Sequence, residues 1–209
     1  MRYRSVRLIL LSFLAFSSVA LSAGEPASSA EETSALPVGA SLPTLELTSP
    51  DGQPFDLNGA VAAKPTILIL YRGGWCPYCN KQLGQLQAIN TELIDLGYQI
   101  IAVSPDRPEK IRSVLDKTQY DYQLISDTRL AAALACGVAF KVEAKMVEKL
   151  RGYGIDLEEA SGETHHLLPV PTVFVLDTEG TVRYVYSNAD YKVRIDPAEL
   201  VNEARKALG

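Results

Sequence analysis

The sequence has few of the residues that staple small proteins or bind metals, with three cysteines and two histidines among 209 residues. Three cysteines are too few for a disulfide-stapled scaffold. Hydrophobic residues make up 47% of the chain, enough for the core of one domain of about 100–200 residues. Acidic residues outnumber basic ones, 25 to 20, and the resulting net charge of −5 argues against nucleic acid and anionic membrane surfaces as partners. We therefore expect one globular domain in which cysteine serves chemistry.

The longest apolar stretch, Leu8–Leu21, has 14 residues, whereas a membrane-spanning helix needs about 20. Three arginines precede it and small residues up to Ala23 follow it, which is the pattern of a secretory signal peptide. We predict a signal peptide over residues 1–23 and an exported, periplasmic protein. An uncleaved anchor is the alternative. Loss of the three arginines would take the net charge from −5 to −8.

Residues 24–35 are rich in Ser, Ala and Glu, which predicts a flexible linker before a domain over residues 36–209. Strands and helices alternate along that domain, which indicates a central sheet with helices on both faces. We treat residues 141–168 as an insertion, helical over Lys141–Arg151 and otherwise loop-like. The predicted strands are 45–47, 66–71, 99–103, 124–125, 172–177 and 182–186, and the predicted helices are 76–96, 108–117, 128–136 and 196–208.

The chemistry concentrates in the sequence YRGGWCPYC, residues 71–79, which follows a predicted strand and opens a predicted helix. The first turn of a helix has unpaired N–H groups and the positive end of the dipole, so a thiolate at Cys76 is stabilised there. Cys79 lies one turn further on the same face and can attack a mixed disulfide at Cys76. Pro77 is tolerated in this first turn. The motif predicts a redox-active dithiol.

A static disulfide or half of a metal site is the alternative for this pair. Zinc requires a second pair of ligands, for which the sequence offers only Cys136, His165 and His166. Cys136 lies in an apolar helical segment and is expected to pack as a small hydrophobic residue. The two histidines could hold a proton or a metal, but an exposed loop position without function is the simpler interpretation. The sequence therefore predicts neither a metal nor a cofactor.

Two sequence features resemble known families. The CxxC pair, together with Val170-Pro171-Thr172 at the start of a later strand, resembles the thioredoxin superfamily, which implies a thioredoxin fold and a cis Pro171 that faces the dithiol. The segments IIAVSPDRPEKIRSVLD, YQLISDTRLAAALACGVAF and FVLDTEGTVRYVY resemble the peroxiredoxins, of the alkyl hydroperoxide reductase and thiol-specific antioxidant family. The resemblance covers roughly residues 38–205, and YRGGWCPYC marks a peroxiredoxin-like branch in which Cys76 takes the place of the peroxide-reactive cysteine.

The chain departs from the peroxiredoxin pattern around Cys76. The family's proline and threonine before the cysteine are replaced by Ile69 and Gly73, and its peroxide-polarising arginine aligns with Pro171. Arg72 could substitute for that arginine or be structural. Trp75 is expected to pack against and shield the nucleophile.

Three functions share this nucleophile. The first is a peroxiredoxin-like antioxidant that reduces hydroperoxides at the expense of a thioredoxin-like protein or a small thiol. The second is an envelope thiol–disulfide oxidoreductase acting on protein disulfides. The third is a copper chaperone that uses both cysteines and a histidine. No stable membrane partner is expected.

Overall fold

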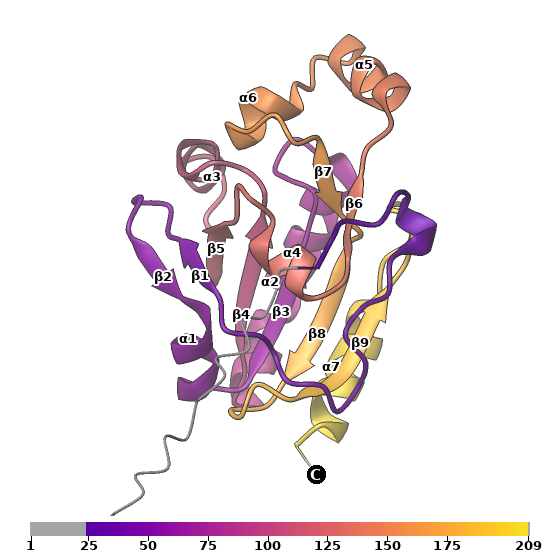
Figure 1. The fold of residues 1–209 in the computed structure, drawn as a ribbon. Helices are drawn as coiled ribbons and strands as arrows, with labels where there is room; N and C mark the ends of the chain where they lie inside the picture. Colours follow the sequence, from indigo (N-terminus) through magenta and orange to yellow (C-terminus); the bar gives the residue numbers. More distant parts are fainter. Residues whose placement is uncertain (1–23, 209) are drawn as a thin grey trace, which may run out of the picture.

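The computed structural model describes residues 24–208 (Figure 1). The predicted signal peptide, and the anchor that is its alternative, lie outside the described residues. Among residues 24–208, no helix is both long enough and apolar enough to cross a membrane.

Seven strands form one mixed sheet in the order β2-β1-β5-β4-β3-β8-β9. The three strands β3, β4 and β5 are parallel, and the remaining pairs are antiparallel. The strands are β1 (Glu46–Thr48), β2 (Pro54–Asp56), β3 (Thr66–Leu70), β4 (Gln99–Ser104), β5 (Gln123–Ser126), β8 (Thr172–Leu176) and β9 (Val182–Ser187). This architecture confirms the predicted thioredoxin-type fold with an N-terminal strand extension.

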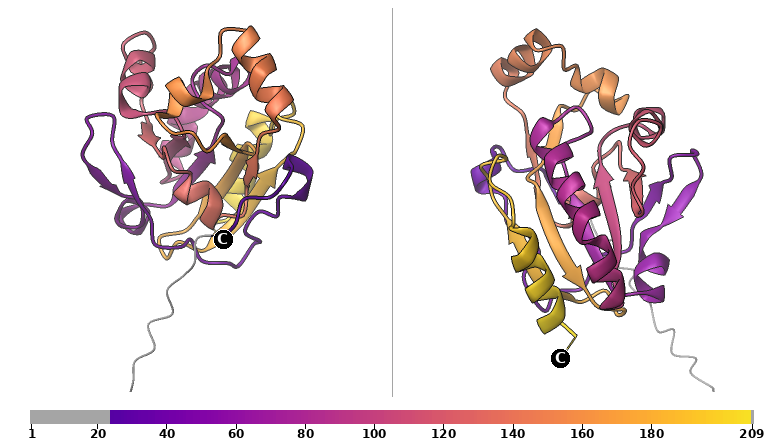
Figure 2. Two further views of the ribbon diagram at one scale, coloured as in Figure 1. Left: turned by 45° about the horizontal axis from the view of Figure 1, so that its top comes forward. Right: turned by 180° about the vertical axis from the view of Figure 1, so that it is seen from behind.

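Helices cover both faces of the sheet. On one face, α2 (Pro77–Asp95) and α7 (Pro197–Lys206) lie side by side, with α3 (Pro108–Leu115) packed into the same apolar cluster (Figure 2). On the other face, α1 (Leu57–Ala63) and α4 (Ala131–Ala135) contribute to a second cluster. The central sheet is therefore buried on both sides.

Strand β3 shows why this sequence forms a buried central strand. Alternate side chains point to opposite faces of a strand, so Ile67 and Ile69 enter the core beneath α2 while Leu68 and Leu70 enter the core beneath α1 and α4. All four side chains are buried. Burying each of these four side chains contributes about 1.5–3 kcal/mol to stability. The CxxC motif therefore follows a firmly packed strand.

The insertion is more regular than the sequence indicates. Strands β6 (Ala139–Lys141) and β7 (Leu167–Pro169) pair as a ribbon that leads to α5 (Ala144–Gly152) and α6 (Leu157–Ser161) at the top of Figure 1. The predicted helix is confirmed as α5, whereas α6 was expected to be loop. Asp156 caps α6 by accepting hydrogen bonds from the N–H groups of Glu158 and Glu159, at 2.9 and 3.1 Å. Leu157 packs into a small apolar cluster that includes Leu150, which buries one side of this helix.

The expected linker, residues 24–35, lies against the domain. Ala27 forms a parallel bridge with Phe140 of β6. The Ser34 N–H donates to the Gly137 carbonyl at 3.0 Å, and a 3-10 helix, η1 (Ala30–Glu32), lies between these contacts. Backbone hydrogen bonds hold this segment in place, and such bonds do not depend on the composition of the side chains. Its composition alone did not predict this order.

Candidate active site

The CxxC motif lies between the end of β3 and the start of α2. Cys76 is the N-cap of α2, with Pro77 in the first helical turn, as the sequence predicts. The Cys76 N–H donates to the Gly73 carbonyl at 3.1 Å, which closes a tight turn before the helix. Gly73 has φ of 141°, and a Cβ at this position would collide with the indole Nε1 of Trp75. The glycine is therefore needed to bring the nucleophile to the helix terminus.

The two thiols are free and adjacent. The Cys79 thiol donates a hydrogen bond to the Cys76 sulfur, and this bond is the main reason that the pKa of Cys76 is lowered to about 6. Burial opposes the shift, while the Cys79 backbone N–H and the charges of Arg72 and Arg194 add to it. The helix terminus contributes as expected, through the Cys79 N–H, but the neighbouring thiol contributes more.

Cys79 shows the opposite behaviour. The hydrogen bond that it donates to Cys76 raises the pKa of Cys79, and burial raises it further. The arrangement therefore separates an ionised thiol at Cys76 from a protonated thiol at Cys79. The exposed fractions are only 1% for Cys76 and 0% for Cys79, so both residues are almost fully covered.

Arg72 lies beside this pair and is itself buried, with 6% of its surface exposed. Its guanidinium carbon lies 5.1 Å from the ring centroid of Trp75 and 4.1 Å from that of Tyr191. Within the described residues, its Nε has no hydrogen-bond partner. A buried cation with an unused donor next to a thiolate is suited to bind an oxygen atom of an incoming reactant.

A cavity of about 300 Å³ opens on the Arg72 side of the site. Its walls are mainly apolar and combine the insertion, the segment before β8 and the N-terminal segment. They include Arg72, Val142, Met146, Leu168, Pro171 and Tyr191. The cavity provides a path by which a small molecule can approach Arg72.

Pro171 lines this cavity, but its peptide bond is trans, so the expected cis bond is wrong. The chain passes from β7 directly into β8, and the Val170 N–H donates to the Val138 carbonyl at 2.8 Å. That hydrogen bond fixes the segment in an extended course for which the usual trans isomer is sufficient.

Arg194, in the segment between β9 and α7, was not identified from the sequence. Its Nη2 donates to the Cys79 sulfur at 3.5 Å, and its Nη1 donates to the Gln82 Oε1 at 2.8 Å. No local motif marks this arginine, because it reaches the site from more than a hundred residues along the chain.

Asp106 was also missed, although its position offered a signal. It follows β4, and the carboxyl ends of neighbouring parallel strands meet at one edge of a sheet. Its Oδ2 accepts the Gly74 N–H at 2.6 Å, while its Oδ1 has no partner within the described residues. Burial raises the pKa of Asp106 to about 6. This carboxyl holds the turn that carries the nucleophile.

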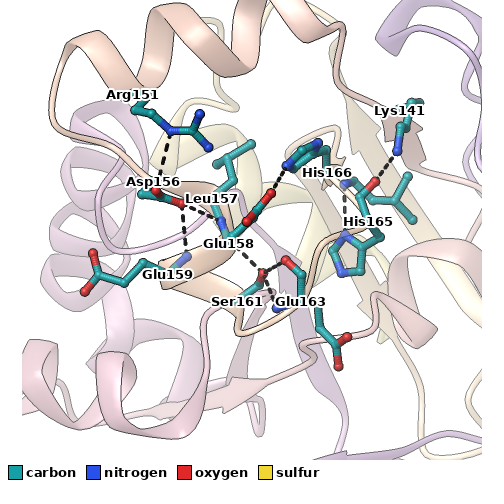
Figure 3. A network of polar contacts seen from close by, with 11 residues as sticks. Lys141, Arg151, Asp156, Leu157, Glu158, Glu159, Ser161, Glu163, His165 and His166 are labelled. Carbon is teal, nitrogen blue, oxygen red and sulfur yellow. Dashed lines mark hydrogen bonds and ion pairs between the residues drawn. The ribbon is translucent and has the colours of Figure 1, made fainter.

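The two histidines belong to the polar network of the insertion (Figure 3). His166 Nε2 contacts Glu158 Oε1 at 2.7 Å, and His165 Nε2 contacts the Thr128 carbonyl at 2.7 Å. The residues that the structure describes contain no group of three or more His, Cys, Asp or Glu side chains placed to hold a metal. Cys136 is buried in the apolar cluster beneath α4, where burial raises its pKa to about 12.

This mixed sheet, with a dithiol at the N-terminus of the helix after a central strand, defines a thioredoxin-fold redox protein. The AhpC/TSA family matches residues 38–185. A chloroplastic peroxiredoxin Q of Sedum lineare is 24% identical over 170 residues, which cover 81% of this chain and 76% of that protein. The chain belongs to the AhpC/TSA family and is a peroxiredoxin-like oxidoreductase.

Solved structures agree on the fold. Peroxidoxin BcpB from Mycobacterium tuberculosis matches with a TM-score of 0.64 and 21% identity, over 82% of this chain and 97% of that chain. A peroxiredoxin-like protein from Aquifex aeolicus matches with a TM-score of 0.65 and 20% identity, over 83% of this chain and 89% of that one.

Proposed function

We propose that this protein reduces hydroperoxides at Cys76 and resolves the product with Cys79. The Cys76 thiolate attacks the terminal peroxide oxygen and the O–O bond breaks. The alkoxide or hydroxide that leaves takes up a proton from solvent, equal to the one that Cys76 released on ionising, and departs as alcohol or water. Cys76 becomes a sulfenic acid. Cys79 then displaces the hydroxyl as water and forms a disulfide, and two thiols of a reductant restore the dithiol. The observation that carries this proposal is the position of Cys76 as the N-cap of α2, one turn before Cys79, where the pKa of Cys76 is lowered and that of Cys79 is raised.

Arg72 is the residue that we assign to the peroxide oxygens. The family's arginine aligns with Pro171 in this chain, so the usual cation is missing from that position. Arg72 lines the cavity and supplies a buried guanidinium whose Nε has no hydrogen-bond partner among residues 24–208. Trp75 and Tyr191 hold it from two sides. A fixed cation stabilises the negative charge that develops on the leaving oxygen.

The burial of Cys76 favours peroxide over a protein disulfide as the oxidising substrate. A hydroperoxide can reach a nearly covered sulfur, whereas a protein disulfide must bring its own backbone to within bonding distance. The reductant is proposed to be a thioredoxin-like protein or a small thiol, and a protein reductant requires local opening around the covered sulfurs.

The test compares two activities on one reduced sample. Peroxide consumption with an excess of thiol reductant is expected to exceed the reduction of insulin disulfides by at least about tenfold in rate. Cys76→Ser is expected to abolish peroxide consumption, whereas Cys136→Ser is the matched control that retains it. Insulin reduction without peroxide turnover above the Cys76→Ser background would favour the oxidoreductase function instead.

We also infer export to an oxidising compartment, where a reactive dithiol is of use. The support is the basic, apolar and small-residue order of residues 1–23. Expression of the full chain in a Gram-negative host, followed by fractionation and N-terminal sequencing, tests this inference. A mature protein in the periplasmic fraction is expected, and full-length protein in the cytoplasm would contradict it.

A further inference from the structure

The geometry around Arg194 points to a catalytic residue for the second half of the reaction. We propose that Arg194 activates Cys79, by stabilising the thiolate that attacks the sulfenic acid at Cys76. This inference rests on the proposed function. Arg194 touches a reacting atom, since its Nη2 lies 3.5 Å from the Cys79 sulfur.

The guanidinium is held in one orientation by two hydrogen bonds besides its contact with Cys79. Its Nε donates to the Tyr191 carbonyl at 2.9 Å, and its Nη1 donates to the Gln82 Oε1 at 2.8 Å. Gln82 is buried and lies on α2 one turn after Cys79. The two groups of α2 that Arg194 contacts, the Gln82 amide and the Cys79 sulfur, therefore lie on the same face of the helix. The Nη2 is thereby directed at the sulfur, which is the arrangement expected of a preorganised donor rather than of a solvated arginine.

Resolution needs such a donor because Cys79 starts as a poor nucleophile. In the reduced pair, its proton is shared with the Cys76 thiolate, and burial also disfavours its ionisation. Tyr71, the neighbouring buried hydroxyl, stays protonated because burial raises its pKa. The positive charge of Arg194 is the main influence that favours the Cys79 anion.

Oxidation of Cys76 changes this balance. Conversion to the sulfenic acid removes the anion that accepts the Cys79 proton, while Arg194 stays in place. The Cys79 thiol then ionises, its sulfur attacks the Cys76 sulfur, and the S–O bond breaks as the S–S bond forms. The Cys79 proton and the departing hydroxide leave as water. The Cys79 sulfur is oxidised and the Cys76 sulfur is reduced, so no further reactant is needed. Charge-assisted hydrogen bonds are about twice as strong as neutral ones, which is why the arginine matters at this step.

The experiment separates the two steps of a single turnover. Reduced protein is mixed with hydrogen peroxide at pH 8, where Cys76 is ionised with or without Arg194, and the fluorescence of Trp75, the chain's single tryptophan, is followed. For Arg194→Met we expect the peroxide-dependent phase to change less than about threefold and the peroxide-independent resolution phase to slow at least about tenfold. Trapping with dimedone should show a correspondingly longer-lived sulfenic acid.

Two further variants control for charge and structure. Arg194→Lys keeps the charge but loses the fork that bonds Gln82 and Cys79 together, so it should resolve at an intermediate rate. Arg205→Met removes an exposed arginine that pairs with Glu92 on the outer surface, and it should behave as wild type. Resolution of Arg194→Met at the wild-type rate would overturn the proposal.

A measurement without peroxide keeps this inference separate from the proposed function. In a Cys76→Ser, Cys136→Ser background, Cys79 is the remaining thiol, and its ionisation is read from the ultraviolet absorbance of the thiolate. Arg194→Met should raise the midpoint by at least about one pH unit, which is about 1.4 kcal/mol. An unchanged midpoint would refute the role of Arg194. If wild type shows no peroxide-dependent phase but Arg194→Met still shifts the Cys79 midpoint, only the peroxidase function is refuted.

Discussion

The thiol of Cys79 is the largest single influence on the ionisation of Cys76, so replacing it with alanine should have a measurable effect. A hydrogen bond to a charged group contributes about 1.5–3 kcal/mol, and 1.36 kcal/mol corresponds to one pKa unit. Cys79→Ala should therefore raise the Cys76 pKa from about 6 to roughly 7–8. At pH 7 the thiolate fraction would fall from about nine-tenths to between about one-half and one-tenth.

The assay is the rate of alkylation of Cys76 by iodoacetamide as a function of pH, read by mass spectrometry. A Cys136→Ser background removes the other buried thiol from consideration. Cys79→Ser is the informative comparison, because its hydroxyl can still donate to the thiolate and should place the midpoint between those of wild type and Cys79→Ala.

A Cys79→Ala midpoint within about 0.3 pH units of the wild-type midpoint would refute the role of the Cys79 thiol. That result would mean that the helix N–H groups and the two arginines hold the anion without the neighbouring thiol. A wild-type midpoint near that of free cysteine would contradict the whole electrostatic description of the site.

Three other predictions follow from the same structure. Arg72→Met should slow the peroxide-dependent phase at least about tenfold at pH 8, measured by stopped-flow fluorescence, whereas an unchanged rate would remove Arg72 from the reaction. Burial raises the pKa of Asp106 to about 6, so the free energy of unfolding should decrease as pH rises from about 4 to 6. In urea titrations, this decrease should be smaller in Asp106→Asn than in wild type by on the order of 2–3 kcal/mol. An equal decrease in the free energy of unfolding of wild type and Asp106→Asn would exclude Asp106 as its cause. Leu68→Ala should destabilise the protein by about 2–5 kcal/mol in the same titrations, and a loss below about 1 kcal/mol would contradict the tight packing of β3.

Local patterns in the sequence predicted the elements that carry the dithiol. The run over residues 67–70 is apolar throughout because β3 is covered on both faces, and the leucines after Cys76 recur with helical spacing because α2 buries one side. The placement of Cys76 at the helix N-terminus followed from these two patterns alone. The family resemblance then agreed with the matched AhpC/TSA family.

What the sequence did not predict depends on contacts between distant segments. Helix α6 is only five residues long and relies on its Asp156 cap and on a small cluster of its own, so no periodicity marks it. Arg194 and Asp106 reach the motif from other elements, and their side chains carry no local signature of a redox site. The peptide bond before Pro171 is trans, unlike the bond that a resemblance to thioredoxin implies.

The most direct test of the account is to add one equivalent of hydrogen peroxide to fully reduced protein and map the cysteines by mass spectrometry. We predict that two thiols are lost, that a disulfide joins Cys76 to Cys79, and that Cys136 remains a free thiol. Recovery of all three free thiols after peroxide treatment, or a disulfide that involves Cys136, would contradict the claim that Cys76 and Cys79 form the reacting pair.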